Sequence, residues 1–191
     1  KVQEGLADEL IGIRKAAAAA RDQKNALRAQ RQLMDRGGFY TGTAGFNVNA
    51  AKRLLVSLGF KDLAPQVADA ETFTAQAKNV ALALVGGSLG VGFSNADRDF
   101  IEAQVAGLGN TPEGNRRLID LMTAIADRKI AIAKIASRYA EDAGGNLDLG
   151  FIDFIDNWSR QNPFQIPGVQ SGSSDEQAVA TENLLKKLGA Q

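Results

Sequence analysis

The stretch that decides the fold runs from residue 111 to residue 145 and reads TPEGNRRLIDLMTAIADRKIAIAKIASRYAEDAGG. Thr111 is a favourable N-cap, Pro112 suits the first helical position, and Glu113 complements the positive end of the helix dipole. Apolar residues then recur at helical spacing as far as Gly144 and Gly145. They are Leu118, Leu121, Met122, Ile125, Ile132 and Ile135. This pattern predicts one long central helix, typical of the spine of a bundle or of a larger assembly.

The N-terminal segment, residues 2–36, predicts a second long helix. Its run KAAAAARDQKNALRAQRQLMDR has high helix propensity, and Gly37 and Gly38 mark its end. The apolar positions of the segment are Leu6, Leu10, Ile13, Ala17, Ala20, Leu27 and Leu33. Because much of this face is alanine, we expect it to pack closely against another helix or another copy of the chain.

Basic side chains outnumber acidic ones in this N-terminal segment. They are Lys15, Arg21, Lys24, Arg28, Arg31 and Arg36. Two interpretations are open: a solvated helix face, which is the more ordinary one, or a surface for a partner. A nucleic acid bound by this helix is a weaker variant of the second interpretation.

The remaining segments predict shorter helices joined by glycine-rich loops. Helices are expected over 49–58, 71–85 and 95–105, and Pro65 lies either in the first turn of a brief helix or in a loop. Another helix follows, with the packing face Phe151, Phe154, Ile155 and Trp158. Because no segment alternates as a strand would, the predicted fold class is all-α, a multi-helix bundle.

The chain divides by composition into three parts. Residues 1–36 form the long N-terminal helix for assembly or packing, and residues 37–160 form a helical domain. Residues 161–191 hold prolines and a Ser/Gly cluster and predict a linker, followed by a peripheral helix capped by Ser174.

Composition excludes several classes of chemistry. The 191 residues include no cysteine and no histidine, so disulfides, thiolate nucleophiles, Cys/His zinc sites and Ser-His-Asp triads are impossible. Acidic and basic residues number 22 each, so no net charge attracts the chain to nucleic acid or to an anionic membrane, although local patches stay possible. We expect no cofactor and no enzymatic activity.

The chain shows no signal peptide and no apolar run long enough to span a bilayer. It begins with Lys1 rather than methionine, which suggests a processed product or part of a longer protein.

The glycine-rich stretch GGSLGVGFSNADRDF, residues 86–100, invites comparison with phosphate-binding loops. Phe93 stands where a P-loop needs lysine, and Asn95 stands where a dinucleotide-binding loop needs its third glycine. We therefore interpret the stretch as a close-packed connection between two helices. Ser94 and Asp97 form a capping box for the second helix, with Asp in place of the usual Glu.

Carboxylates are the remaining candidates for chemistry. Asp153 and Asp156 share a helix face, and Asp148 lies just before them. This trio supports an alternative function, a small helical metal-dependent enzyme or binding protein. The more ordinary interpretation is the solvated side of a helix.

The segment GVGFSNADRDFIEAQVAGLGNTPEGNRRLIDLMTAIADRKIAIA resembles a helical module of tailed-bacteriophage virion proteins, over about residues 90–140. The strings from Ser94 to Phe100 and from Gly107 to Arg116 carry the resemblance. It is a resemblance to internal or ejection proteins and tail-associated proteins, and no catalytic or binding residue is attached to it. It implies a non-enzymatic structural subunit or segment of the virion, assembling as a helical oligomer in the head–tail or internal ejection apparatus and aiding genome delivery. The implied partners are further copies and other virion proteins, and membrane contact follows only for an ejection protein.

Overall fold

The structure is a computed structural model. It describes residues 2–36, 47–57, 60–69, 71–73, 75–76, 79, 89–106 and 111–166. Within these ranges the chain forms helices and connecting segments and contains no strand. The prediction of an all-α fold is confirmed. None of the helices in this part of the chain is both long enough and apolar enough to cross a membrane.

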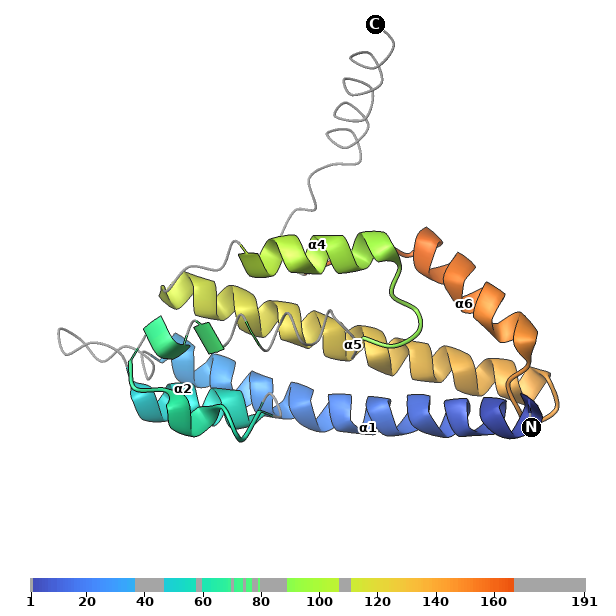
Figure 1. The fold of residues 1–191 in the computed structure, drawn as a ribbon, viewed down its shortest axis with the longest axis horizontal. Coiled ribbons are helices and arrows are strands. Elements are labelled where there is room, and N and C mark those ends of the chain that lie inside the picture. Colours follow the sequence, from blue (N-terminus) through green and yellow to red (C-terminus); the bar gives the residue numbers. More distant parts are fainter. Residues whose placement is uncertain are drawn as a thin grey trace, which may run out of the picture.

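Two long antiparallel helices, α1 (Val2–Asp35) and α5 (Pro112–Asp142), form the spine of the molecule and lie side by side (Figure 1). Small residues allow this close approach, since Ala17 on α1 and Ala136 and Ala140 on α5 are buried. Larger side chains such as Leu27 and Leu121 complete one continuous core. The alanine-rich helix thus packs against another helix of the same chain, one of the two arrangements expected.

The boundaries of α5 follow the local rules of the sequence. Thr111 accepts a hydrogen bond from the Gly114 amide at 3.0 Å, so it is the N-cap. At the other end Gly144 and Gly145 have φ values of 84° and 110°, in the left-handed region that glycine tolerates. The Gly145 amide donates to the Ala140 carbonyl at 2.7 Å and closes the helix.

Helix α2 (Val48–Ser57) contacts α1 and buries the side chains of Ala50, Ala51, Leu54 and Leu55. Pro65 lies in the short 3₁₀ turn Ala64–Gln66, as its fixed φ favours. Of the helix expected over 71–85, residues 71–73, 75–76 and 79 are helical, and its apolar end lies outside the described residues.

Helix α4 (Asn95–Ala106) runs beside α5 on the side away from α1, whereas α6 (Leu149–Gln161) begins near the C-terminal end of α5 and rises at an angle to it (Figure 1). On α4, Ile101 and Val105 are buried and Phe100 packs against the core. On α6, Phe151 and Ile155 are buried, but Phe154 is 46% exposed. The prediction of a buried Phe154 is therefore wrong, although its ring lies 5.4 Å from that of Tyr139.

The segment after α6 differs from the predicted linker. Phe164 and Ile166 are buried in the core. The ring centroid of Phe164 lies 5.8 Å from that of Phe93 and 6.3 Å from that of Phe100. Residues up to 166 therefore belong to the packed helical body, and the predicted boundary at 160 falls too early. The rest of the linker and the helix expected after Ser174 lie outside the described residues.

Candidate functional site

The residues that carry the resemblance begin with a reciprocal cap at the start of α4. The Asp97 amide donates to Ser94 Oγ at 3.1 Å, and the Ser94 amide donates to Asp97 Oδ2 at 2.9 Å. Each side chain thus satisfies a backbone donor that the first turn of the helix leaves free. The predicted capping box is confirmed, with Asp in the place of Glu.

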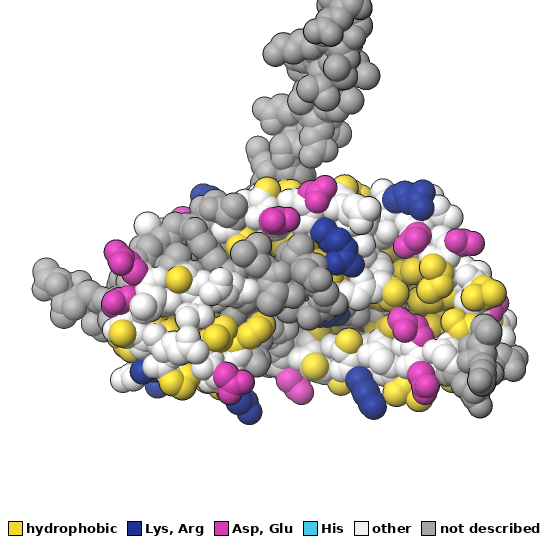
Figure 2. Space-filling view, viewed as in Figure 1, with side chains coloured by type: hydrophobic (Ala, Val, Ile, Leu, Met, Phe, Trp, Pro, Cys, Tyr) yellow, Lys and Arg dark blue, Asp and Glu magenta, His cyan; other side chains and the backbone are white. Residues whose placement is uncertain are grey.

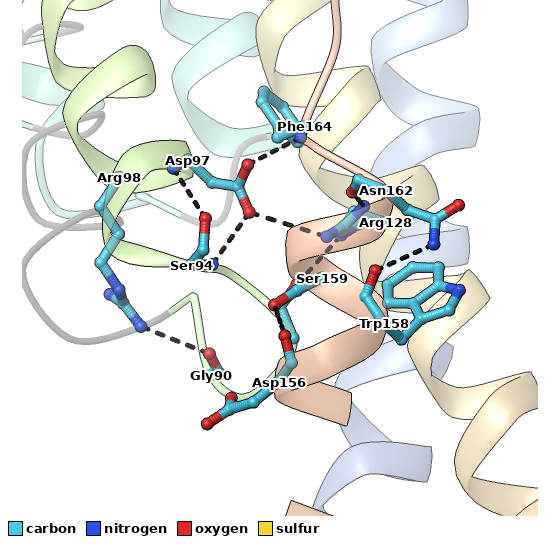
Figure 3. A network of polar contacts seen from close by, with 11 residues as sticks. Gly90, Ser94, Asp97, Arg98, Arg128, Asp156, Trp158, Ser159, Asn162 and Phe164 are labelled. Atoms are coloured by element: carbon cyan, nitrogen blue, oxygen red, sulfur yellow. Dashed lines mark hydrogen bonds and ion pairs between the residues drawn. The ribbon is translucent and has the colours of Figure 1, made fainter. Parts of the chain in front are cut away.

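Asp97 has a second role, which the sequence did not indicate. Its side chain is only 3% exposed, and its Oδ1 accepts a hydrogen bond from the Phe164 amide at 2.7 Å (Figure 3). Its Oδ2 lies 3.6 Å from Nη2 of Arg128 on α5. The carboxylate therefore joins the start of α4 to the centre of α5 and to the segment after α6.

Arg128 extends this group of contacts, which we call the Asp97–Arg128 clasp. Its Nε donates to the Gly92 carbonyl at 3.0 Å, and its Nη1 donates to the Asn162 carbonyl. The guanidinium carbon lies 4.2 Å from the ring centroid of Trp158, a favourable cation–π distance (Figure 3). One side chain thus holds the glycine loop, α6 and the chain after α6.

The electrostatics of the clasp suit a structural role. Burial lowers the pKa of Arg128, and the carboxylate of Asp97 opposes that shift. Arginine keeps its charge in proteins, so the buried pair is an ion pair at neutral pH. Both oxygens of Asp97 face donors from the chain itself, and Arg128 Nη2 has the Asp97 charge but no hydrogen-bond partner. This arrangement fixes chain segments and offers no free group for acid–base chemistry.

Gly92 is the glycine of the loop that the packing requires. Its φ is +78°, and a Cβ built on it would lie 2.6 Å from Cδ1 of Ile132. Gly90 also has a positive φ, +77°, but no atom would lie within 4 Å of a Cβ added there. The interpretation of a close-packed connection therefore holds at Gly92, where the backbone touches α5.

The sequence did contain one signal for Arg128. It falls on the apolar stripe of α5, at helical spacing from Leu121, Ile125 and Ile132. A charged residue in such a stripe needs a buried partner of opposite charge. The sequence does not identify Asp97 as the partner of Arg128, because Asp97 lies on another helix.

The acidic trio of the sequence is not assembled into a site. Asp148 is the N-cap of α6, and its Oδ1 accepts hydrogen bonds from the Phe151 amide at 3.2 Å and from the Tyr139 hydroxyl at 2.6 Å. The side chains of Asp153 and Asp156 are exposed on α6. In the part of the chain that the structure describes, no three carboxylates lie together so as to hold a metal ion. The alternative of a metal site on this trio is therefore not supported.

Some basic side chains of α1 pair with α5, and others are exposed to solvent. Lys24 pairs with Asp127 and Arg31 pairs with Asp120, both on α5. These two side chains keep 29% and 35% of their surface exposed, so the interpretation as a solvated face is right for them only in part. Lys15, Arg21 and Arg28 remain exposed.

Hydrophobic side chains also remain at the surface. Leu149 and Ile152 on α6 are 70% and 39% exposed, and Phe154 lies on the same helix. Figure 2 shows hydrophobic side chains gathered near α6 and the N-terminal end of α1, with acidic side chains around them. Leu149 and Ile152 are three residues apart and share one side of α6, and we call these two side chains the α6 surface. Phe154, two residues after Ile152, lies on the other flank of the helix, beside Tyr139.

Comparison of the chain with protein-family models, with curated proteins and with solved structures gives no match.

Proposed function

We propose that this chain is a non-enzymatic structural component of a bacteriophage virion. In this role it assembles as a helical oligomer in the head–tail or internal ejection apparatus and assists delivery of the genome. Its partners are further copies of itself and other virion proteins.

The proposal rests mainly on what the residues that resemble virion proteins, Ser94–Phe100 and Gly107–Arg116, do in the fold. Ser94 and Asp97 cap α4, Thr111 caps α5, and Asp97 pairs with Arg128. The side chain of Asn115, in the second part of the string, is buried as well. The distinctive residues thus serve to hold helices together, which is what a module shared among structural proteins requires.

The α6 surface supports the assembly part of the proposal. Its two large apolar side chains, Leu149 and Ile152, are exposed on a helix whose packed side carries Phe151 and Ile155. Exposed apolar groups of this size gain free energy when a partner covers them, at about 25 cal/mol per Å². A second copy of the chain or a neighbouring virion protein would provide that cover.

Two measurements test the proposal together. Mass spectrometry of purified particles of the phage that encodes the chain should detect it in many copies. Sedimentation velocity of the isolated chain should show oligomers whose fraction grows with concentration. A chain that stays monomeric at high concentration and is missing from the particles would contradict the proposal.

A further inference from the structure

The edge between α1 and α5 carries a ladder of charges. On α5, Asp120, Asp127 and Lys134 recur every seven residues, so they lie along one edge of the helix. Arg31 meets Asp120 and Lys24 meets Asp127 across the interface. At these two steps a cation of α1 faces an anion of α5.

At the next step the pattern reverses, because α5 presents a cation. Arg14 and Arg21 of α1 and Lys134 and Arg138 of α5 line a groove of about 470 Å³, which we call the basic groove. Glu141 is the one carboxylate in its lining. Four positive charges therefore border the groove against one negative charge.

The floor of the basic groove explains why it stays open. Ala17 and Ala133 lie in its lining, and their short side chains form a low floor between the longer side chains at its borders. Arg14 is held at the border by a hydrogen bond from its Nε to Ser137 Oγ at 3.2 Å. Among the described residues, Arg21, Lys134 and Arg138 have neither an ion-pair partner nor a side-chain hydrogen bond.

Like charges placed together destabilise a fold unless an anion lies between them. From this arrangement we propose that the basic groove binds the phosphodiester backbone of a nucleic acid. Arg14 and Arg21 are two helical turns apart, about 10 Å along the axis. One strand of a duplex carries a phosphate about every 3.4 Å of helix axis, so this length corresponds to about three phosphate steps measured along that axis. The planar guanidinium groups match phosphate oxygens in a bidentate manner.

An anionic membrane fits the basic groove less well. Helices that bind membrane surfaces place large apolar side chains such as Trp, Phe or Leu beside their basic residues. The uncharged residues in the lining of the groove are two alanines and a serine. The equal totals of 22 acidic and 22 basic residues do not oppose the inference, because the acidic residues balance the chain elsewhere and the groove acts locally.

The test measures binding of a fluorescent DNA oligonucleotide, as a duplex and as a single strand, by fluorescence anisotropy. The full chain should bind with a Kd of about 10⁻⁴ to 10⁻⁶ M near physiological salt, the range of sequence-independent contacts. The double variant Arg21→Gln/Lys134→Gln should weaken binding at least about tenfold and reduce the salt slope for the duplex by about two. Glu141→Gln should strengthen binding, since it removes the only negative charge of the groove.

The matched control is Lys15→Gln/Arg160→Gln, which removes the same charge from exposed positions outside the groove. It should change the affinity less than about twofold, since the phosphate contacts remain. Thermal unfolding shows whether the groove variant folds, and its Tm should be unchanged or higher because two like charges are gone.

Three results would overturn the inference. The first is that the full chain does not bind DNA. The second is that the control variant and the groove variant lose the same DNA affinity. The third is that the chain binds phosphatidylserine vesicles and not DNA. The inference does not depend on the virion proposal. If the chain binds DNA but is missing from phage particles, only the virion proposal is contradicted. If the chain is present in particles but does not bind DNA, only the inference about the basic groove is contradicted.

Discussion

The carboxylate of Asp97 lies 3.6 Å from the guanidinium of Arg128, and the two side chains are only 3% and 9% exposed. The residues are 31 positions apart in the sequence and come from different helices, α4 and α5. Around them the Gly92 carbonyl, the Phe164 amide and the Asn162 carbonyl are all engaged. This pair is the point where the glycine loop, the long central helix and the segment after α6 are joined.

Asp97→Asn should destabilise the fold strongly. The substitution leaves the charge of Arg128 buried without its counter-charge, which costs about 3–5 kcal/mol in comparable pairs. Chemical denaturation measures the free energy of unfolding. Asp99→Asn, on the exposed side of the same helix, should change it by less than about 0.5 kcal/mol. Equal effects of the two substitutions would show that the clasp contributes little.

Gly92→Ala should also destabilise the fold, by about 2 kcal/mol or more, because strain at a positive φ is joined by a clash with Ile132. Gly90→Ala is the matched control, since its φ is nearly the same but no atom lies near its added Cβ. It should cost about 1 kcal/mol. If the two glycines responded alike in thermal unfolding, the close contact with α5 would not matter.

Phe164→Ala tests whether the segment after α6 belongs to the core. Its ring is buried and contacts two other aromatic rings, so its loss should cost about 3–5 kcal/mol. The neighbouring Gln165 is exposed, and Gln165→Ala should leave the free energy of unfolding nearly unchanged. If Phe164→Ala changed the free energy of unfolding only slightly, this segment would be a linker, as its composition predicts, and not part of the core.

The Tyr139 hydroxyl should titrate above its usual pKa of 10.0, because its hydrogen bond to the Asp148 carboxylate favours the neutral phenol. Since the pKa is higher in the folded state, this contribution to stability is complete below the unfolded pKa, about 10, and is lost as pH rises through the folded pKa. Tyrosinate absorbance in a Tyr40→Phe background follows this group alone, as the chain has 2 tyrosines. Asp148→Asn should lower the pKa, while Asp153→Asn should not. An unchanged pKa in Asp148→Asn would contradict the assignment.

Leu149→Ser/Ile152→Ser should weaken self-association at least about tenfold if the α6 surface is where copies meet. The folded chain should lose little stability, because Leu149 is 70% and Ile152 39% exposed. Sedimentation velocity over a range of concentrations gives the association constant. Val56→Ser, at an exposed position on α2, is the control and should have no effect. If Leu149→Ser/Ile152→Ser and Val56→Ser both left the association constant unchanged, the contact between copies would not involve the α6 surface.

The helices and their ends were predictable because they depend on neighbouring residues. Thr111 and Pro112 begin α5, Gly144 and Gly145 end it, and Ser94 with Asp97 begins α4, all through contacts a few residues apart. The periodic apolar face of α1 likewise predicted its burial. Such local signals were sufficient for the all-α class and for the apolar faces of α1 and α5.

Contacts between distant segments were beyond the sequence. Asp97 could be identified as a cap, but its pairing with Arg128 exists only because the start of α4 is placed beside the middle of α5. Phe164 follows a proline in a polar stretch, and only the space beside Phe93 and Phe100 makes it a core residue. The basic groove likewise needs the antiparallel register of α1 and α5, which brings Arg21 and Lys134 to the same opening. The sequence by itself determined which residues form helices, because helix formation depends on local periodicity and capping. Only the tertiary structure decided which charged side chains and aromatic rings contact each other, because those contacts depend on how the helices are placed against one another.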